Sequence, residues 1–506
     1  MHSTAPPRHI LSKSTFMRGC QCAKSLWLHK HHPELKDQLS DSQQAIFTQG
    51  TNVGLIAREL FPGGIDASPA TPFEYQKSVQ HTAKLIANGQ TIIYEAAFQF
   101  EGVLAAIDIL VKKEGKWLAY EVKSSTSVKD PYLRDAALQY HVLTSCGIEL
   151  EDIFIVYINN EYIRNGDLEP GKLFARESVK AQAIAQQTGI REQINAFKEL
   201  LNVQQMPDMD IGAHCHDPYP CDFTGHCWQH LPQESVFDLR GRGGFDLALE
   251  LYKKGIYTIN EIPEDHPVGN SQRVQVEVSK TGQPVLNKEE IRNFLAGLVY
   301  PLYFVDFETF NDAVPGHDGC WPYQQLPFQF SLHIIDSPAQ LSLPKDQVEH
   351  RCFLAPHDTD PRIPFINTLV ENLGDSGSII VYNQAFENSR LSELAETFPA
   401  LSQQVASIQS RMVDLMIPFR KKHYYLPSMK GSYSIKEVLP ALVPGLSYAD
   451  LPINNGGTAS QAFCQLKYER DQSRVEEIRK QLLDYCEMDT WAMVRIMENL
   501  YLKSID

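Results

Sequence analysis

Two carboxylates alternate with aromatic residues in the segment PLYFVDFETF, where Asp306 and Glu308 lie two positions apart. In a β-strand such a pair projects from one face, because the side-chain period is two. The apolar neighbours indicate a strand that is buried on both faces. Two adjacent carboxylates in such surroundings repel each other and lose hydration unless a cation lies between them. The segment therefore predicts a divalent-cation site; the alternative is an edge strand whose acids face solvent.

Two helical segments each place one further acid among apolar side chains. In 475–500 an apolar stripe with helical spacing contains Asp489, and Tyr485 lies one turn earlier on the same face. In 385–398 Glu387 shares a helical face with leucines, and Asn383 precedes the helix as a candidate cap. An acid on a buried helix face is expected to be neutral or bound to a metal ion. Together with the strand, these segments predict four acids around one site.

By order and spacing, these segments resemble the DEDD exonucleases of the tyrosine subclass, the DnaQ-like branch of the RNase H fold. The resemblance extends over about 300–503. The matched positions are Asp306 and Glu308 in the Asp-x-Glu motif, Asn383, Phe386 and Glu387 in the Asn-x-x-Phe-Asp motif, and Tyr485 and Asp489 in the Tyr-x3-Asp motif. Glu387 departs from the pattern, because the family usually has aspartate there. The resemblance implies 3′–5′ exonuclease activity.

The chemistry implied by this resemblance is two-metal hydrolysis of a phosphodiester. Two divalent ions about 4 Å apart activate a water and stabilise the leaving 3′-oxygen. Asp306, Glu308 and Asp489 would hold the ions, with Glu387 completing the set, and Tyr485 would orient the attacking water. Carboxylate ligands favour Mg²⁺ or Mn²⁺, which are hard, oxygen-seeking ions.

The N-terminal half contains a second set of acids, formed by Asp108 after a hydrophobic strand and by Glu121 and Lys123 on the strand WLAYEVK. Glu121 and Lys123 share one strand face, and Gln139 lies on a following helix. A surface salt bridge is the alternative for an isolated Glu-x-Lys. The set resembles the RecB-type PD-(D/E)xK nucleases. That resemblance implies that Asp108 and Glu121 bind a metal, Lys123 positions or activates a water, and Gln139 is the family's glutamine.

One ligand of this second set differs from the family pattern. RecB-type members often carry a metal-binding histidine on an early helix after Phe-x-x-Gly, and here FTQGTNVG has Gly54 near that place. The third side-chain ligand is then missing or comes from elsewhere, with Glu95 and Glu59 as candidates. A backbone carbonyl and water are the alternative way to complete the shell.

Three cysteines, Cys215, Cys221 and Cys227, are evenly spaced in the polar loop HCHDPYPCDFTGHCW, and Cys22 lies far upstream in QCAKSLWL. Such thiols in an intracellular chain indicate metal ligands before disulfides. The arrangement resembles that of iron–sulfur RecB-type nucleases, which implies that these four cysteines hold a 4Fe–4S cluster. A Cys3His zinc site stays open as the alternative, because three histidines lie nearby.

Basic residues are concentrated in two short stretches, which are candidate phosphate-binding surfaces. The alternative is a pair of ordinary solvated faces. The first stretch, residues 1–34, contains Arg8, Lys13, Arg18, Lys24 and Lys30, and the second is Arg420, Lys421 and Lys422.

The overall composition bounds the class of protein. The 506 residues carry a formal net charge of −16, so nucleic-acid contact must come from local basic patches. Ten cysteines are too few for a disulfide scaffold, and the longest apolar run is too short to span a membrane. A soluble, cytoplasmic enzyme without membrane contact is expected.

The order of expected strands and helices predicts an α/β protein with two mixed-sheet domains. We expect an N-terminal restriction-endonuclease-like (PD-(D/E)xK) domain at 1–234 and a C-terminal RNase H-like domain at 299–506. Residues 235–298 are expected to form a helical linker in which LALELYKKGIYTINEI resembles a helix-hairpin-helix.

The whole chain resembles a bacterial family that joins a RecB-like iron–sulfur module to a DEDD exonuclease. The match is carried by LSKSTFMRGCQCAKSLWL, NNEYIRNGDL and YPLYFVDFETF. It implies a metal-dependent nuclease of DNA or RNA, with DNA the favoured partner. Two other classes stay open: a nucleic-acid-binding or scaffold protein with one or both sites inactive, and a redox-sensing regulator built on the cluster.

Overall fold

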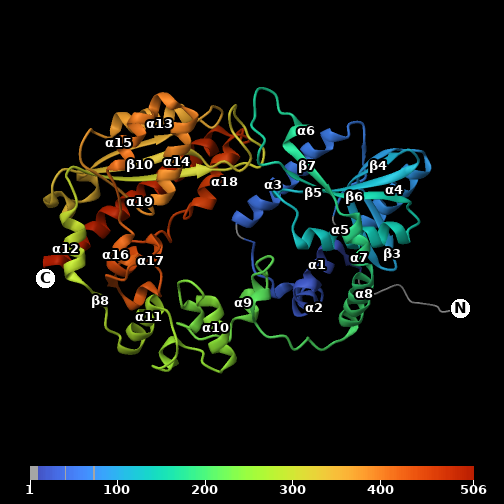
Figure 1. Cartoon of the computed structure of the whole chain (residues 1–506), viewed down its shortest axis with the longest axis horizontal. Helices are drawn as coiled ribbons and strands as arrows, with labels where there is room; N and C mark the ends of the chain where they lie inside the picture. The colour runs from blue at the N-terminus through green and yellow to red at the C-terminus, as the bar shows by residue number, and fades with distance from the viewer. Residues whose placement is uncertain (1–9, 40, 72–73, 506) are drawn as a thin grey trace. The chain divides into compact units, whose positions relative to one another are not determined.

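The computed structural model describes residues 10–39, 41–71 and 74–505, and these form a mixed α/β protein. The chain divides into two compact units (Figure 1). Unit 1 comprises residues 1–230 and 312–323, and unit 2 comprises 231–311 and 324–506. The fold is therefore α/β with mixed sheets, and each unit is described by itself.

A mixed sheet in the order β2-β3-β4-β5-β6-β7 forms the centre of unit 1, and β1 pairs with β4. The strands are β1 (Leu11–Ser12), β2 (Ile65–Asp66), β3 (Ile92–Phe100), β4 (Val103–Lys113), β5 (Lys116–Lys123), β6 (Leu150–Ile158) and β7 (Phe174–Ser178). Strands β3, β4 and β5 are antiparallel, whereas β5 and β6 are parallel and joined through helix α5 (Asp130–Ser145). The β4–β5 turn uses Glu114 and Gly115, both at positive φ, as a two-residue hairpin loop requires.

The helices of unit 1 complete its core. Helix α5 packs on the sheet through residues such as Leu138 and Val142, and α1 and α8 cover the same apolar cluster with Phe16 and Ile194. The helices are α1 (Lys13–Gln21), α2 (Ala23–His31), α3 (Asp41–Ala57), α4 (Tyr75–Ala87), α5, α6 (Pro170–Leu173), α7 (Lys180–Ala185), α8 (Gln187–Asn202) and α9 (Thr224–Cys227).

The short segment 312–323, which follows β9 in the sequence, belongs to unit 1. The backbone of Arg164 exchanges hydrogen bonds with this segment, donating to Cys320 and accepting from Gly319 at 2.9 and 2.8 Å. The Arg164 side chain also donates to the Pro315 carbonyl. Arg164 lies in the NNEYIRNGDL stretch, so one role of that stretch is to hold this segment.

Unit 2 is built on a five-stranded sheet in the order β11-β10-β9-β12-β13. The strands are β9 (Leu302–Phe310), β10 (Leu326–Ile335), β11 (Glu349–Leu354), β12 (Ser378–Val381) and β13 (Met412–Asp414), with β8 (Val285–Leu286) and β14 (Tyr424–Tyr425) as a separate pair. Strands β9 to β11 are antiparallel, and β9, β12 and β13 are parallel. β9 therefore lies at the centre of the sheet.

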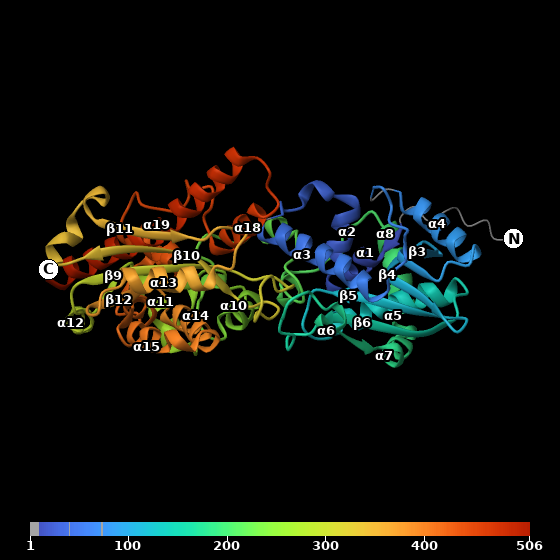
Figure 2. The same ribbon diagram turned by 90° about the horizontal axis from the view of Figure 1, so that it is seen from above.

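Helices cover both faces of this sheet (Figure 2). Helix α19 packs on the face formed by Phe304 and Phe328, whereas α13 and α14 pack on the face formed by Val305 and Phe330. The helices of unit 2 are α10 (Gly244–Lys253), α11 (Asn270–Thr281), α12 (Lys288–Ala296), α13 (Arg362–Asn372), α14 (Gln384–Thr397), α15 (Ser402–Ser410), α16 (Ile417–Arg420), α17 (Ile435–Leu442), α18 (Gly456–Leu466) and α19 (Gln472–Ile505).

Residues 235–298, expected as a linker, are grouped with unit 2 and carry a small apolar cluster around Leu239, Ala248 and Leu251. Gly255 follows α10 at a φ of 78°, where it closes the helix C-terminus. The segment after it forms a 3₁₀ turn at Ile259–Glu261 before α11, in place of the second helix of a hairpin.

Candidate active sites and a cysteine pocket

Three acids of unit 2 come together between β9 and α19. Asp306 and Glu308 project from β9 toward α19, which supplies Asp489. Each of the three offers a carboxylate oxygen within 4.8 Å of the others. Glu308 and Asp489 are each only 6% exposed, and Asp306 is partly buried. The strand and helix periodicities thus bring together residues that are more than 180 positions apart in the sequence.

Burial acts on all three carboxyls, and the charge of Asp489 acts on the other two. Burial first, and then the charges of Asp489 and its neighbours, raise the pKa values of Asp306 and Glu308 well above their ordinary range. Burial also raises the pKa of Asp489 to about 6, although neighbouring hydroxyls and the ammonium of Lys436 oppose the shift. The cluster holds more negative charge than its surroundings compensate, which is the electrostatic condition that a divalent cation relieves.

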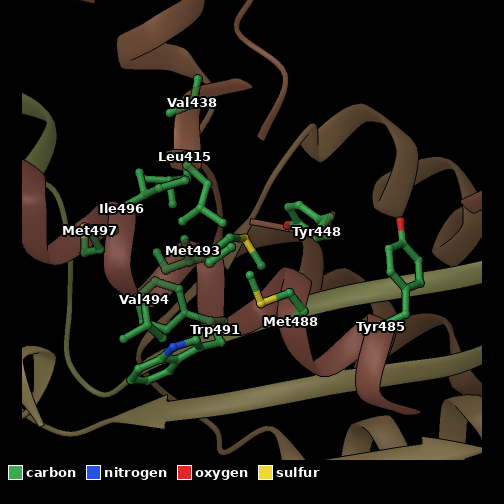
Figure 3. Packing of buried hydrophobic residues seen from close by; sticks show 14 of the residues in the cluster. Leu415, Val438, Tyr448, Tyr485, Met488, Trp491, Met493, Val494, Ile496 and Met497 are labelled. Carbon is green, nitrogen blue, oxygen red and sulfur yellow. The ribbon is translucent and has the colours of Figure 1, made fainter. Parts of the chain in front are cut away.

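Two residues at this site were not recognised from the sequence. The Tyr448 hydroxyl donates to Asp489 Oδ1 at 2.7 Å, and Lys436 Nζ lies 5.6 Å from the ring centroids of Tyr448 and Tyr485. Figure 3 shows Tyr448 near α19 and Tyr485 extending from that helix. No motif spacing marks Tyr448 or Lys436; their only sequence signal is an aromatic or basic residue in a segment of ordinary composition.

Glu387, the fourth expected acid, lies near the first turn of α14 and is 2% exposed. It is not one of the three acids within 4.8 Å, but its charge contributes to the raised pKa of both Asp306 and Glu308. Burial raises the pKa of Glu387 itself to about 8, and its Oε2 has no hydrogen-bond partner among the described residues. A buried carboxylate oxygen without a partner is the kind of group that a cation or water satisfies.

Asn383 stands at the N-cap position of α14, but its side chain makes no capping hydrogen bond. Its backbone adopts a φ of 86°, and its N–H donates to Asp414 Oδ1 at 3.1 Å. The expectation that its side chain caps the helix is therefore wrong. The left-handed backbone at Asn383 redirects the chain between β12 and the helix that carries Glu387.

The acids of unit 1 form a buried network across β4, β5, α1 and α5. Lys123 Nζ donates to Glu121 and to Asp135 at 2.6 and 2.7 Å, and Gln139 donates to Glu121 Oε2 at 2.7 Å. Asp108 accepts the backbone N–H of Val122 at 2.6 Å. The four expected residues thus share one site, so the Glu-x-Lys pair is not an isolated surface bridge.

Lys13 was expected on a basic surface, but it belongs to this network. Its ammonium lies 2.7 Å from Glu121 Oε1 and 3.8 Å from Asp135 Oδ2. Burial opposes ionisation of Glu121, but the ammonium groups of Lys123 and Lys13 outweigh it and lower the pKa of Glu121. Burial and the Glu121 charge instead raise the pKa of Asp108 to about 8.

Of the two candidates for a third acidic ligand, the structure favours Glu95. Glu95 lies on β3 at the level of Asp108, between the paired positions Tyr94–Ile109 and Ala96–Ile107, and its charge raises the pKa of Asp108. Its φ of 53° is a left-handed conformation inside a strand, which re-aims the side chain. Glu59 is exposed, and a Cβ built on Gly54 would meet no atom within 4 Å.

The four expected cysteines line one pocket of unit 1, together with Met209 and Phe223. Cys22 is 8% and Cys215 is 7% exposed. Burial, and then the neighbouring thiols, raise the pKa of Cys22 and Cys227. Cys20 instead donates to Gln193 and does not line the pocket. The pocket therefore includes Cys22 and not Cys20.

The spacing of these thiols can be compared with the spacing of sulfurs around a zinc ion. A tetrahedral zinc ion with bonds of about 2.3 Å holds its sulfurs about 3.8 Å apart. Within the described parts of the chain, no three of the pocket's cysteine and histidine ligand atoms lie within 4.8 Å of one another. In any three of these ligand atoms, at least one pair is therefore more than 4.8 Å apart.

The first basic stretch is largely engaged in internal contacts, whereas Arg420 and Lys421 of the second are exposed. Arg18 pairs with Asp222, and Lys13 belongs to the carboxylate network, while Arg8 lies outside the described residues. Lys422 is buried and donates to the Gly431 carbonyl at 2.7 Å. The expectation that Lys422 presents its charge on a surface is wrong, because its ammonium serves a backbone carbonyl inside unit 2.

Comparison with known proteins gives limited matches. A family model described as "Domain of unknown function (DUF2779)" matches residues 303–434. Uncharacterized protein UU173 of Ureaplasma parvum serovar 3 is 29% identical over 219 residues, covering 38% of this chain and 30% of that protein. The Uncharacterized protein MG366 homolog of Mycoplasma pneumoniae is 29% identical over 215 residues, covering 38% and 31%. The chain thus matches about a third of the length of these curated relatives.

Among solved structures, the crystal structure of SSO0001 aligns with 41% of this chain and 82% of that chain, at 12% identity and a TM-score of 0.21. Across 10–39, 41–71 and 74–505, no helix combines the length and hydrophobicity needed to cross a bilayer.

Proposed function

We propose that this protein is a metal-dependent nuclease whose unit 2 is a DnaQ-like DEDD domain with 3′–5′ exonuclease activity. The observation that carries the proposal is the cluster of Asp306, Glu308 and Asp489, which each offer a carboxylate oxygen within 4.8 Å of the others. Glu308 and Asp489 are buried, Asp306 is partly buried, and the charge of Asp489 repels the other two carboxylates. Glu387 supports it, because a buried acid with an unpartnered oxygen stands beside the trio. DNA is the favoured substrate and RNA the alternative.

In this mechanism Asp306, Glu308 and Asp489 would hold Mg²⁺ or Mn²⁺, and Glu387 would complete the acidic set. When bound, such ions activate a water and stabilise the leaving 3′-oxygen. Tyr448 fixes the rotamer of Asp489 through its hydrogen bond to Oδ1. Tyr485 is placed one turn before Asp489, where its hydroxyl orients the attacking water. Lys436 supplies the nearby positive charge that favours a phosphate.

Unit 1 is proposed to be a RecB-like PD-(D/E)xK domain with a second nuclease site. Asp108, Glu121 and Glu95 are its proposed metal ligands, and Lys123 positions the water. Gln139 holds Glu121 by its hydrogen bond to Oε2. Cys22, Cys215, Cys221 and Cys227 are proposed to hold a 4Fe–4S cluster, which links α2 to the loop around α9.

The test for unit 2 is hydrolysis of 5′-labelled single-stranded DNA and RNA by the full chain with Mn²⁺ or Mg²⁺. We expect a ladder of products shortened from the 3′ end. Asp489→Asn should abolish the ladder. Asp484→Asn, an exposed acid on the same helix, is the matched control and should keep it. A ladder that persists unchanged in Asp489→Asn and Asp306→Asn would refute the proposal.

A second candidate, favoured by one observation, is that unit 1 binds nucleic acid without cutting it. Two ammonium groups already neutralise Glu121, at 2.6 and 2.7 Å. A metal ion must compete with the Lys13 charge for this carboxylate. Endonucleolytic cleavage in an Asp489→Asn background, lost on Glu121→Gln, would exclude this candidate. Retained DNA binding with no cleavage in that background would support it.

A further inference from the structure

A second polar cluster in unit 2 connects the edge strand β11, its neighbour β10 and helix α19. His333, His350 and Glu487 each offer a ligand atom within 4.8 Å of the others. His333 is fully buried, while His350 and Glu487 are partly buried. His333 and His350 are directly paired across β10 and β11, so both rings project from the same face of the sheet.

Hydrogen bonds behind the two rings hold them from one side. His333 Nδ1 lies 2.8 Å from Thr490 Oγ1, and His350 Nε2 lies 2.9 Å from Ser331 Oγ. The Ser331 and Thr490 hydroxyls are 2.7 Å apart, and Thr490 Oγ1 donates to the Glu487 carbonyl at 3.1 Å. Ser331 and Thr490 are themselves buried.

One assignment of protons satisfies all these contacts together. Thr490 donates to the Glu487 carbonyl, so it accepts from both His333 Nδ1–H and the Ser331 hydroxyl. Ser331 then accepts from His350 Nε2–H. This leaves His333 Nε2 and His350 Nδ1 with free lone pairs. His333 Nε2 is buried and has no hydrogen-bond partner among the residues described, and His350 Nδ1 lies 3.9 Å from Glu487 Oε1.

From this arrangement we propose that His333, His350 and Glu487 form a binding site for a divalent transition-metal ion, with Zn²⁺ the best fit. Two neutral imidazoles and one carboxylate are a donor set that suits zinc, whereas Mg²⁺ prefers oxygen ligands alone. Each imidazole donates its other N–H to a hydroxyl, which is how ligating histidines are commonly oriented. Zinc bonds of about 2.1 Å place ligands about 3.4 Å apart, so Glu487 Oε1, which lies 3.9 Å from His350 Nδ1, must approach that nitrogen by about 0.5 Å.

The role of the ion is structural, because it joins edge strand β11 to the helix that carries Asp489. Lys345 Nζ lies 2.9 Å from Glu487 Oε1 and is partly exposed, so it can move away when the ion binds. The site is distinct from the carboxylate trio: its donors are nitrogen-rich, and Ser331, which lies behind it, is paired across the sheet with Asp306. The ion therefore holds β10, β11 and α19 together next to the carboxylate trio.

The test is equilibrium dialysis of the full chain against Zn²⁺, with metal content measured per chain. We expect the wild type to hold one zinc more than His350→Asn and Glu487→Gln. His81→Asn, an exposed histidine on α4, is the matched control and should bind as the wild type does. Zinc held by cysteines is unchanged across this series, so it does not affect the difference.

Two further measurements keep the result interpretable if a variant is destabilised. Thr490→Val retains all three ligands and should weaken zinc binding by about 10–100-fold. Co²⁺ bound in this site should give a ligand-field absorption without thiolate charge transfer, and Glu487→Gln should abolish it. Equal zinc content in the wild type, His350→Asn and Glu487→Gln, with no cobalt absorption of this kind, overturns the proposal. Loss of nuclease activity does not enter this readout.

Discussion

Asp489→Asn should stabilise the metal-free protein while it abolishes exonuclease activity. The buried Asp489 carboxyl has a pKa raised from 3.8 to about 6, chiefly by burial. An acid whose pKa is higher in the folded state binds its proton more tightly there. Its ionisation therefore lowers the free energy of unfolding. The loss is absent below pH 3.8, grows between pH 3.8 and pH 6, and is constant above pH 6. Asparagine keeps the shape and an acceptor for the Tyr448 hydroxyl.

The size of the effect follows from the two pKa values. At pH 7 the linkage relation gives a gain of about 3 kcal/mol in the free energy of unfolding for Asp489→Asn. At pH 5, where the folded carboxyl is mostly protonated, the same relation gives about half of that gain. For a domain of this size, each kcal/mol raises the melting temperature by about 2–4 °C, so we expect about 6–12 °C at pH 7.

The assay is calorimetry in EDTA at pH 7 and pH 5, repeated with Mn²⁺ in place of EDTA. Mn²⁺ at about 100 times its dissociation constant should stabilise unit 2 of the wild type by about 2.7 kcal/mol and leave the unfolding of unit 2 in Asp489→Asn unchanged. Asp484→Asn should change neither result. If Asp489→Asn lowers the melting temperature in EDTA at both pH values, burial does not disfavour the Asp489 carboxylate and the reasoning is refuted.

Three further changes test other parts of the two units. Glu387→Gln should lower the 3′–5′ exonuclease rate by about 10–100-fold in single-turnover assays, because it removes the fourth charge, whereas exposed Glu396→Gln on the same helix should not. Lys13→Met should lower the free energy of unfolding of unit 1 by about 1–3 kcal/mol in urea titrations, because it removes a partly buried partner of the buried Glu121 carboxylate; exposed Lys77→Met should not. Cys227→Ser should remove iron and visible absorbance and lower the melting temperature, whereas Cys146→Ser, an exposed thiol outside the pocket, should retain both.

The main elements that position the sites follow from local sequence patterns. The apolar run around Asp306 predicts a strand at 302–307, and β9 extends over Leu302–Phe310. The helical stripe at 475–500 corresponds to α19, which is longer at both ends. Strong periodicity identifies such buried elements because each must present a continuous apolar face. The acids stand out for the same reason, since they interrupt those faces.

Residues that complete the sites were not predictable, because they arrive from distant segments with ordinary local patterns. Lys13 is 108 positions from Glu121, and Tyr448 is 41 positions from Asp489. In the sequence Lys13 is one base among several in a basic stretch, and nothing local separates a buried lysine from a solvated one. The left-handed backbone of Glu95 could not be predicted either, because glutamate rarely adopts a positive φ and nothing in the local sequence indicates one.

The two carboxylate sites differ in how their negative charge is compensated. This difference predicts which of the two sites gains more stability when it binds a metal ion. In unit 1 the ammonium groups of Lys123 and Lys13 lie against Glu121 and lower its pKa, so a cation gains less by entering and must compete with Lys13. In unit 2 the pKa values of Asp306 and Glu308 are raised, and Lys436 is the one cation that acts on Glu308 among the described residues. A divalent ion relieves more repulsion there. Stabilisation by Mn²⁺ should therefore be larger for unit 2 than for unit 1.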